Sequence, residues 1–245
     1  MNAGRTFGIA LLSAGALASA ASASVTWEGS GSGSGALSAR AEFSLSGGDL
    51  VVHLTNTGTG DVMVPTDVLT AVLFDISGSS VSLTRSSAVL GAGSSVYYDP
   101  DGQPSGGVVG GEWAYKSGLS GAPSNCTYGI SSTGLGLFGP GDLFPGPDLC
   151  PPSSPDGLQY GILAAGDNTA TGNSAILNSG GLIKNEVVFT LGGAGGNFDL
   201  SRITNVFFLY GTAIGEGGFN GHNVPSPGAL ALLGLGGVLC VRRKR

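Results

Sequence analysis

Alternating hydrophobic and polar positions predict β-strands along much of the chain. Residues 39–45 alternate, and residues 49–56 repeat the pattern after a Ser-Gly-Gly turn, which is a hairpin signal. Residues 67–77 are more continuously apolar, which predicts a strand buried on both faces. Further strands are expected at residues 80–85, 112–116, 157–162, 183–191 and 203–211.

Two stretches interrupt this pattern. Residues 91–160 are dominated by Gly, Pro, Ser and Asp, and so long an irregular stretch is uncommon in a compact domain unless it is functional or tied down. Residues 28–38 are rich in Gly and Ser, which predicts a flexible linker or a long surface loop. We therefore predict an all-β fold over residues 24–220. It would be an antiparallel β-sandwich, immunoglobulin-like or jelly-roll-like, with a long Gly/Pro-rich loop.

The N-terminal residues follow a different order. Arg5 precedes an apolar run from Phe7 to Ala18, and small residues follow as far as Ala23. A basic, an apolar and a small-residue region in this order are typical of a secretory signal peptide, and the run is too short for an anchor helix. We expect residues 1–23 to be removed on export, with cleavage after Ala23 preferred.

The C-terminal residues 221–245 form a tail with a short apolar run. As a helix, the run Gly228 to Val241 would span about 21 Å, which is less than the roughly 30 Å hydrocarbon core of a bilayer. The basic residues after it would stay in the cytoplasm and orient the body outside the inner membrane. The alternatives are a permanent single-pass anchor and a buried core helix.

The tail resembles the PEP-CTERM sorting signal, in the form found in planctomycete-type bacteria. Its proline pair is matched by Pro225 and Pro227, while Ser226 replaces the glutamate of that motif. A terminal basic cluster is matched by Arg242, Arg243, Lys244 and Arg245. The resemblance implies processing by an exosortase in a Gram-negative bacterium, after a transient stay in the inner membrane. The last 90 residues or so, including "LIKNEVVFTL" and "ITNVFFLYGTAIGE", also resemble exosortase-dependent surface proteins.

Charge limits the partners of the body. Only 11% of the residues are charged, against about 25% in an average domain. Between residues 24 and 225 five bases face all sixteen acids of the chain. Such a surface repels nucleic acid and anionic lipid, and it tolerates divalent cations or neutral glycans.

Export changes how the cysteines are interpreted. Cys126 and Cys150 form an even pair in an oxidising compartment, and they bracket a Gly/Pro-rich stretch that would not hold a shape by itself. We expect a disulfide between them, which could stabilise the fold by roughly 3 kcal/mol. Two free thiols or a metal site are the alternatives.

A search for catalytic chemistry finds no motif with the required context. His53 is expected on the solvent face of a strand, and His222 in a linker. The sequence "GLGLFG" at 134–139 matches a dinucleotide-binding pattern by chance, since no helix follows it. Asp99 and Asp101 have the spacing of calcium ligands, but Asp-Pro-Asp-Gly is also a common turn. We expect no catalytic residue, no metal and no cofactor.

Aromatic residues offer one further candidate site. Trp113 and Tyr115 alternate within a short segment, so both would lie on one face of a strand and could stack on a sugar ring. Core packing is the alternative. The sequence thus predicts an exported, non-enzymatic surface or extracellular-matrix protein with a structural or adhesive role in the cell envelope, in contact with extracellular polysaccharide. The alternative function is a glycan- or calcium-binding module on the same anchor.

Overall fold

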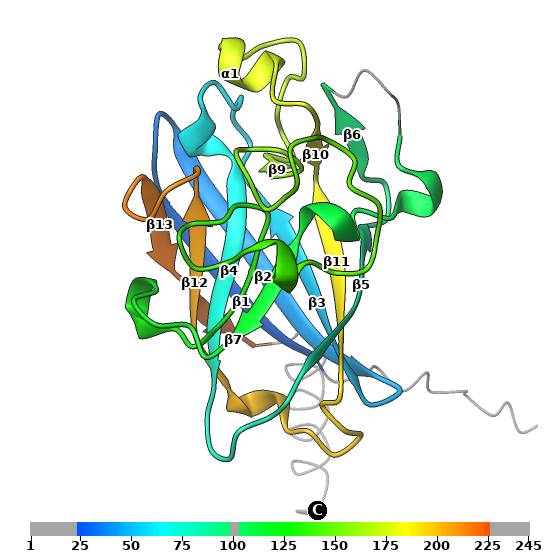
Figure 1. Cartoon of the computed structure of the whole chain (residues 1–245). Coiled ribbons are helices and arrows are strands. Elements are labelled where there is room, and N and C mark those ends of the chain that lie inside the picture. Colours follow the sequence, from blue (N-terminus) through cyan, green and yellow to red (C-terminus); the bar gives the residue numbers. More distant parts are fainter. Residues whose placement is uncertain (1–23, 99–102, 226–245) are drawn as a thin grey trace, which may run out of the picture.

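The computed structural model describes residues 24–98 and 103–225, which form two β-sheets that face each other (Figure 1). The six-stranded sheet has the order β14 (His222–Val224), β1 (Ser24–Ser32), β2 (Ala36–Ser46), β3 (Asp49–Asn56), β11 (Glu186–Gly192) and β5 (Thr84–Leu90). The eight-stranded sheet has the order β13 (Gly217–Asn220), β12 (Ile203–Tyr210), β4 (Leu69–Ile76), β9 (Ile162–Leu163), β10 (Leu182–Lys184) and β6 (Ser95–Tyr97). In the latter, β8 (Tyr128–Ser131) pairs with β4 and with β7 (Ala114–Ser117).

The eight-stranded sheet is mixed. β9 and β10 pair in parallel, and the remaining strand pairs among the described residues are antiparallel. The helical elements are short: α1 (Ser174–Leu177) and the 3₁₀ turns Pro65–Asp67, Ser105–Gly107, Gly110–Glu112, Pro123–Asn125, Pro140–Asp142 and Leu200–Arg202. The all-β prediction is therefore confirmed, and the predicted antiparallel pairing holds for the described strands except β9 and β10.

The main core lies between the two sheets. Phe43 of β2 meets Phe74 of β4 edge to face, with ring centroids 5.3 Å apart. The Tyr210 hydroxyl of β12 donates to the Ser38 carbonyl of β2 at 3.0 Å. These contacts come from strands distant in sequence, as the predicted alternation requires.

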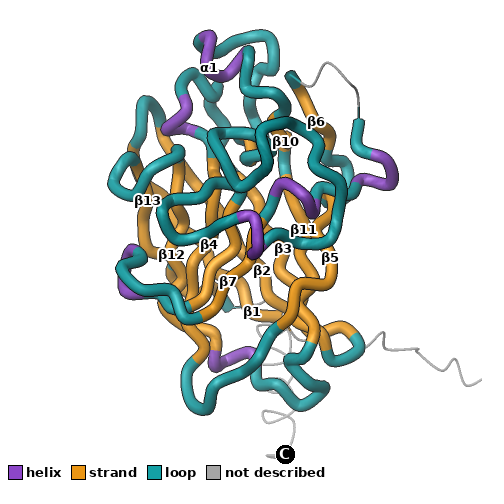
Figure 2. Tube along the Cα trace, in the orientation of Figure 1, coloured by secondary structure: helices purple, strands orange, loops and turns teal. Residues whose placement is uncertain are grey.

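β4 is buried on both faces, as its continuous apolar sequence predicts. Val72 and Phe74 belong to the core between the sheets, whereas Ala71 and Leu73 belong to a second cluster. That second cluster includes Leu119 and other residues of the segments flanking β8, which run over the outside of the eight-stranded sheet (Figure 2). The irregular region is thus a packed cover for this sheet.

Several expected strand boundaries need correction. The stretch 183–191, expected as one strand, is divided at Asn185, whose φ of 89° breaks the extended backbone and sends β10 and β11 into different sheets. The strand expected at 80–85 begins only at Thr84, and the one expected at 157–162 is reduced to β9. The hairpin before β3 forms as predicted, with both Gly47 and Gly48 at positive φ.

The expected linker at residues 28–38 is in fact a β-hairpin made by β1 and β2. Its glycines are explained by packing: a Cβ on Gly29 would lie 2.7 Å from the Phe219 ring of β13, and one on Gly31 would overlap the same ring. Phe219 also packs against the rings of Phe208 and Tyr210. Gly-Ser composition here allows a close approach between the sheets rather than flexibility.

One lateral side of the molecule is closed where the chain passes from β13 to β14 at Gly221. β13 is the edge of the eight-stranded sheet and β14 the edge of the six-stranded sheet, so this corner joins them. β14 pairs with β1, with Thr26 opposite Val224. The six-stranded sheet therefore extends beyond residue 220, and His222 lies in a strand instead of the expected linker. We call this corner, with Phe219 on the β1 glycines, the closed side.

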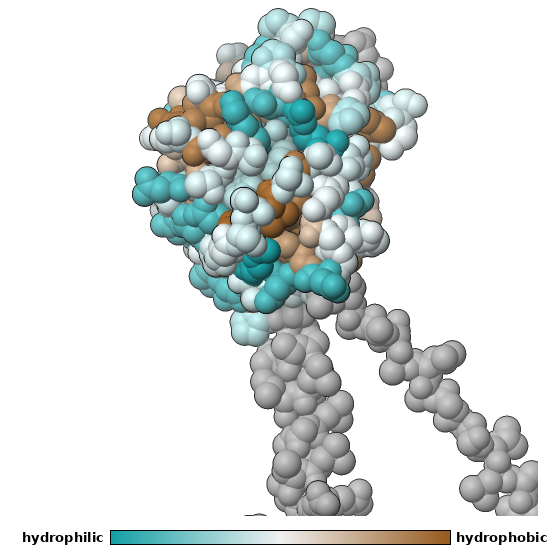
Figure 3. All heavy atoms as spheres, turned by 60° about the horizontal axis from the view of Figure 1, so that its bottom comes forward, coloured by the Kyte–Doolittle hydropathy of each residue, from teal (hydrophilic) through white to brown (hydrophobic). Residues whose placement is uncertain are grey.

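The surface of the body is mixed in polarity. Among the described residues, the exposed large hydrophobic ones are Met63, Tyr97, Leu177 and Ile214. On the face shown in Figure 3, hydrophobic residues come to the surface in separate areas among hydrophilic ones. No helix among residues 24–98 and 103–225 has the length and apolar character that a membrane crossing requires.

Candidate functional site: a polar groove between two sheet edges

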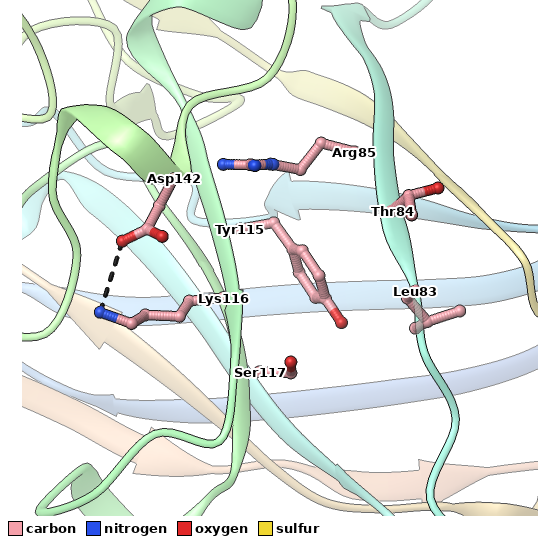
Figure 4. A pocket seen from close by; sticks show the side chains of 7 residues that line it. All are labelled: Leu83, Thr84, Arg85, Tyr115, Lys116, Ser117 and Asp142. Carbon is pink, nitrogen blue, oxygen red and sulfur yellow. Dashed lines mark ion pairs between the residues drawn. The ribbon is translucent and has the colours of Figure 1, made fainter.

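A groove with a volume of about 420 Å³ lies where β5, an edge of the six-stranded sheet, faces β7 of the eight-stranded sheet (Figure 4). Two of its residues come from the start of β5 and one directly precedes that strand, while three come from β7 and one from the 3₁₀ turn Pro140–Asp142. They are Leu83, Thr84, Arg85, Tyr115, Lys116, Ser117 and Asp142. We call this side of the molecule the open side, and the hollow the polar groove.

Arg85 reaches across the polar groove from β5. Its Nη1 donates to the Gly141 carbonyl at 2.5 Å, which fixes the guanidinium against the turn on the far side. The ion pairs found among the described residues join Lys116 to Asp142 and His53 to Glu186, so Arg85 has no carboxylate partner there. A guanidinium has five N–H donors, and the contact with Gly141 leaves most of them available.

Lys116 and Asp142 lie on the side of β7 away from Leu83 and Thr84 (Figure 4). The Lys116 Nζ is 3.4 Å from the Asp142 Oδ2, and it also donates to the Leu137 carbonyl at 2.8 Å. The Asp142 carboxylate accepts from the Gly139 N–H at 3.0 Å, which holds it at the start of its own 3₁₀ turn. The charged residues that line the groove are thus Arg85, Lys116 and Asp142, which give it a positive formal charge.

Tyr115 forms the floor of the polar groove and is 5% exposed. Its hydroxyl oxygen is buried without a hydrogen bond of normal geometry to any described residue, although the Ser117 side chain lies close enough to influence it. Burial raises the pKa of Tyr115 far above its ordinary value, so the hydroxyl stays protonated at neutral pH. Apart from its contact with Ser117, this O–H donor has no hydrogen-bond partner among the described residues.

The stacking platform expected from Trp113 and Tyr115 is not present. Trp113 is completely buried and meets Phe189 of β11 edge to face, with centroids 5.0 Å apart. Burial of the whole ring removes it from any contact with a ligand, so the prediction of a platform is wrong. Tyr115 does line a site, but through its position in the groove and its hydroxyl rather than through an exposed ring face.

The expected disulfide between Cys126 and Cys150 is also wrong, because both thiols are free. Cys126 is buried in the outer cluster beside β12, where its Sγ donates to the Asn205 carbonyl at 3.0 Å. Cys150 packs against Gly180 and the main core instead. Burial raises the pKa of both thiols, that of Cys126 to about 12, so neither is a ready nucleophile.

A buried carboxylate, and not a disulfide, fixes the Pro-rich segment around Cys150. Glu112 is fully buried and accepts hydrogen bonds from the Cys150 N–H at 3.1 Å, from the Ser154 hydroxyl at 2.5 Å and from the Leu149 N–H. Burial raises the pKa of Glu112, and the three donors oppose that rise. Glu112 therefore ties the Pro-rich segment around Cys150 to the body, and no sequence motif marks it.

The histidines lie apart from these groups. His53 is on the outer face of β3, where its Nδ1 is 3.0 Å from the Glu186 Oε1, and its side chain is 40% exposed. The expectation of a surface histidine holds, with the addition of this partner. His222 is exposed on β14.

Other candidate residues fall outside the described part of the chain. Asp99 and Asp101 of the possible calcium loop do so, as do Ser226, Pro227 and the basic cluster Arg242, Arg243, Lys244 and Arg245. Pro225 is described and directly follows β14. Within residues 24–98 and 103–225 no group of three or more His, Cys, Asp or Glu side chains could hold a metal ion.

In comparisons with known proteins, no family model, no curated protein and no solved structure matches the chain.

Proposed function

We propose that the chain is an exported, non-enzymatic surface or extracellular-matrix protein with a structural or adhesive role, delivered by exosortase-type processing of its tail. The proposal starts from the two terminal sequence patterns. The N-terminal segment resembles a signal peptide, and Pro225-Ser226-Pro227 with the apolar run and basic cluster after it resembles a sorting tail.

The observation that carries the proposal is the pairing of the first and last described strands. β1 (Ser24–Ser32) is the first described strand, and β14 (His222–Val224) ends directly before Pro225. The two strands pair, with Thr26 opposite Val224, so the first and last described strands lie side by side, which supports a body whose two ends leave it at one place. Removal of both ends would leave every described strand intact.

The composition of the body supports the same role. Charge is sparse, large exposed hydrophobic residues are few, and irregular segments are fixed by packing and by Glu112 rather than left as linkers. We further propose that the fold belongs to the immunoglobulin-like or jelly-roll-like sandwiches, supported by two sheets around one core. A single hydrophobic C-terminal helix remains a prediction for residues outside the described part.

A binding module on the same anchor is the second candidate function. The polar groove favours it, since it offers a guanidinium without a carboxylate partner among the described residues, together with the buried Tyr115 hydroxyl, in an otherwise low-charge body. The calcium version rests on Asp99 and Asp101, which lie outside the described residues, and it remains a prediction from the sequence.

Deletion of residues 225–245 tests the sorting proposal. We expect the truncated chain to fold, because the deletion begins after β14, and to be lost from the cell-surface fraction of an exosortase-containing host. Replacement of Arg40 by Gln, a change in β2 outside the deleted segment, serves as the control and should leave the location unchanged. An equal surface fraction for the truncated and full chains would refute the sorting role.

A further inference from the structure

We propose that the polar groove binds a saccharide that carries a carboxylate, such as a uronic acid residue of an extracellular polysaccharide. This inference specifies the ligand class of the second candidate function, and it rests on the groove residues alone. It does not require that the tail be processed by any particular enzyme.

The first argument is the distribution of positive charge. The stretch between residues 24 and 225 contains five Lys and Arg residues against sixteen acids, and two of the five, Arg85 and Lys116, line this one groove. Lys116 is largely committed to Asp142, whereas Arg85 has no carboxylate among the described residues. An uncommitted guanidinium in a concave site is a suitable partner for one carboxylate, which it can bind through two parallel hydrogen bonds.

The second argument is the Tyr115 hydroxyl. A buried polar group without a partner costs free energy, and native proteins leave few of them. Tyr115 is 5% exposed, and its hydroxyl oxygen lacks a hydrogen bond of normal geometry within the described part of the chain. A ligand hydroxyl or ring oxygen in the groove would supply the missing acceptor.

The third argument distinguishes a sugar from other anions. The remaining lining is hydroxyl-rich, with Thr84 and Ser117 exposed at the rim, and the aromatic ring of Tyr115 underlies it. A highly charged polyanion would be repelled by the acidic body, because it would extend beyond the two bases of the groove. A ligand with one carboxylate and several hydroxyls matches both the local charge and the local donors.

The fourth argument is size. A volume of about 420 Å³ lies within the range of roughly 300–1,000 Å³ that small-molecule sites occupy, so it suits a short saccharide segment. The groove is open to solvent between two sheet edges, which would let a longer chain continue past it.

Calorimetry on the full-length chain in a polyoxyethylene detergent, which has no sugar headgroup, tests the proposal. The probes are a galactose trisaccharide in which one residue is replaced by galacturonic acid, so that it carries one carboxylate, and the neutral galactose trisaccharide of the same length. We expect the acidic trisaccharide to bind at least about tenfold more tightly than the neutral one. Binding should weaken as salt is raised from low ionic strength to 0.15 M, since about one ion pair is formed.

Variants separate the roles of the groove residues. Arg85→Gln should weaken acidic trisaccharide binding by about tenfold or more. Tyr115→Phe should weaken it about threefold or more without lowering the melting temperature, because the hydroxyl it removes is unpaired in the free protein. Arg40→Gln removes one positive charge from β2, outside the groove, and should leave binding unchanged.

Three results would overturn the proposal. The first is equal or absent binding of both trisaccharides. The second is acidic trisaccharide binding that survives Arg85→Gln. The third is inorganic sulfate competing as effectively as the acidic trisaccharide, which would show a site for small anions only. None of these results bears on the surface location measured with the tail deletion, so the two proposals can fail independently.

Discussion

The same two sheets meet differently at the two lateral sides of the molecule. On the closed side, β13 turns into β14 at Gly221 and Phe219 covers glycines of β1. On the open side, β5 and β7 leave a groove between them, crossed by Arg85 and floored by Tyr115. The closed side also holds the beginning and the end of the described chain.

The comparison of the two sides shows how glycine and charged residues act in this chain, which has many glycines and few charged residues. Glycine removes side-chain volume, so at Gly29 an aromatic ring of the opposite sheet comes into contact with the backbone. On the open side, two of the few basic side chains, Arg85 and Lys116, line a groove in place of a packed contact. Packing therefore closes the side that holds the first and last described strands, and a groove lined by polar side chains remains on the other.

The largest expected effect comes from Trp113, which lies in the main core directly before β7 of the open side. Trp113→Ala removes a fully buried indole next to Phe189, and we expect a loss of about 3–5 kcal/mol in the free energy of unfolding. Denaturant unfolding followed by circular dichroism measures this loss. A variant as stable as the parent would mean that Trp113 is exposed, and the platform hypothesis would return.

The closed side is tested by Gly29→Val. The added side chain would meet the Phe219 ring and the Asn220 carbonyl, so we expect a loss of about 1–3 kcal/mol. Ser30→Val places the same side chain on the exposed face of β1 and should change stability by less than about 0.5 kcal/mol. Equal effects from the two variants would show that the β1 glycines do not serve close packing.

The third prediction concerns the ion pair of His53 and Glu186 on the outer face of the six-stranded sheet. A change there should alter neither the packing of the closed side nor the groove of the open side. The hydrogen bond from His53 to Glu186 raises the pKa of His53 and lowers that of Glu186. The histidine contribution is fully present below its ordinary pKa of 6.5 and is lost as pH rises through the raised value. The glutamate contribution is present above 4.5 and is lost as pH falls through the lowered value.

His53→Gln should therefore destabilise the chain more at pH 5.5 than at pH 9. The difference should be about 0.5 kcal/mol or less, because solvent screens a pair whose histidine is 40% exposed. Thermal unfolding at the two pH values measures it. The idea fails if the loss is the same at both.

Alternation in the sequence was sufficient for the strands whose faces differ in burial. β2, β3, β4 and β12 lie close to where the pattern places them, and β4 has the two buried faces that its apolar run predicts. The division at Asn185 could not be predicted, since hydrophobicity continues across it and only a positive φ separates β10 from β11. The Gly-Ser stretch was misjudged because its partner, Phe219, lies almost 190 residues further along the chain.

The candidate site was less accessible to sequence reasoning. Arg85 and Lys116 belong to different sheets and follow no common motif, so only the fold brings them together. The cysteine pairing followed from the expected compartment and from spacing, and neither reveals that Cys126 packs beside Asn205. The aromatic pair was placed in the right segment, but strand alternation does not say which face is covered by Phe189.

The central claim is that the paired strands at the closed side are the two ends of a processed, exported protein. Intact-mass spectrometry of the chain purified from the surface of an exosortase-containing host tests it most directly. The account predicts a chain that begins at Ser24 and lacks Arg242 to Arg245, with its C-terminus at or near Pro225 to Pro227. A mass corresponding to residues 1–245, with Met1 and the basic cluster both present, would contradict it.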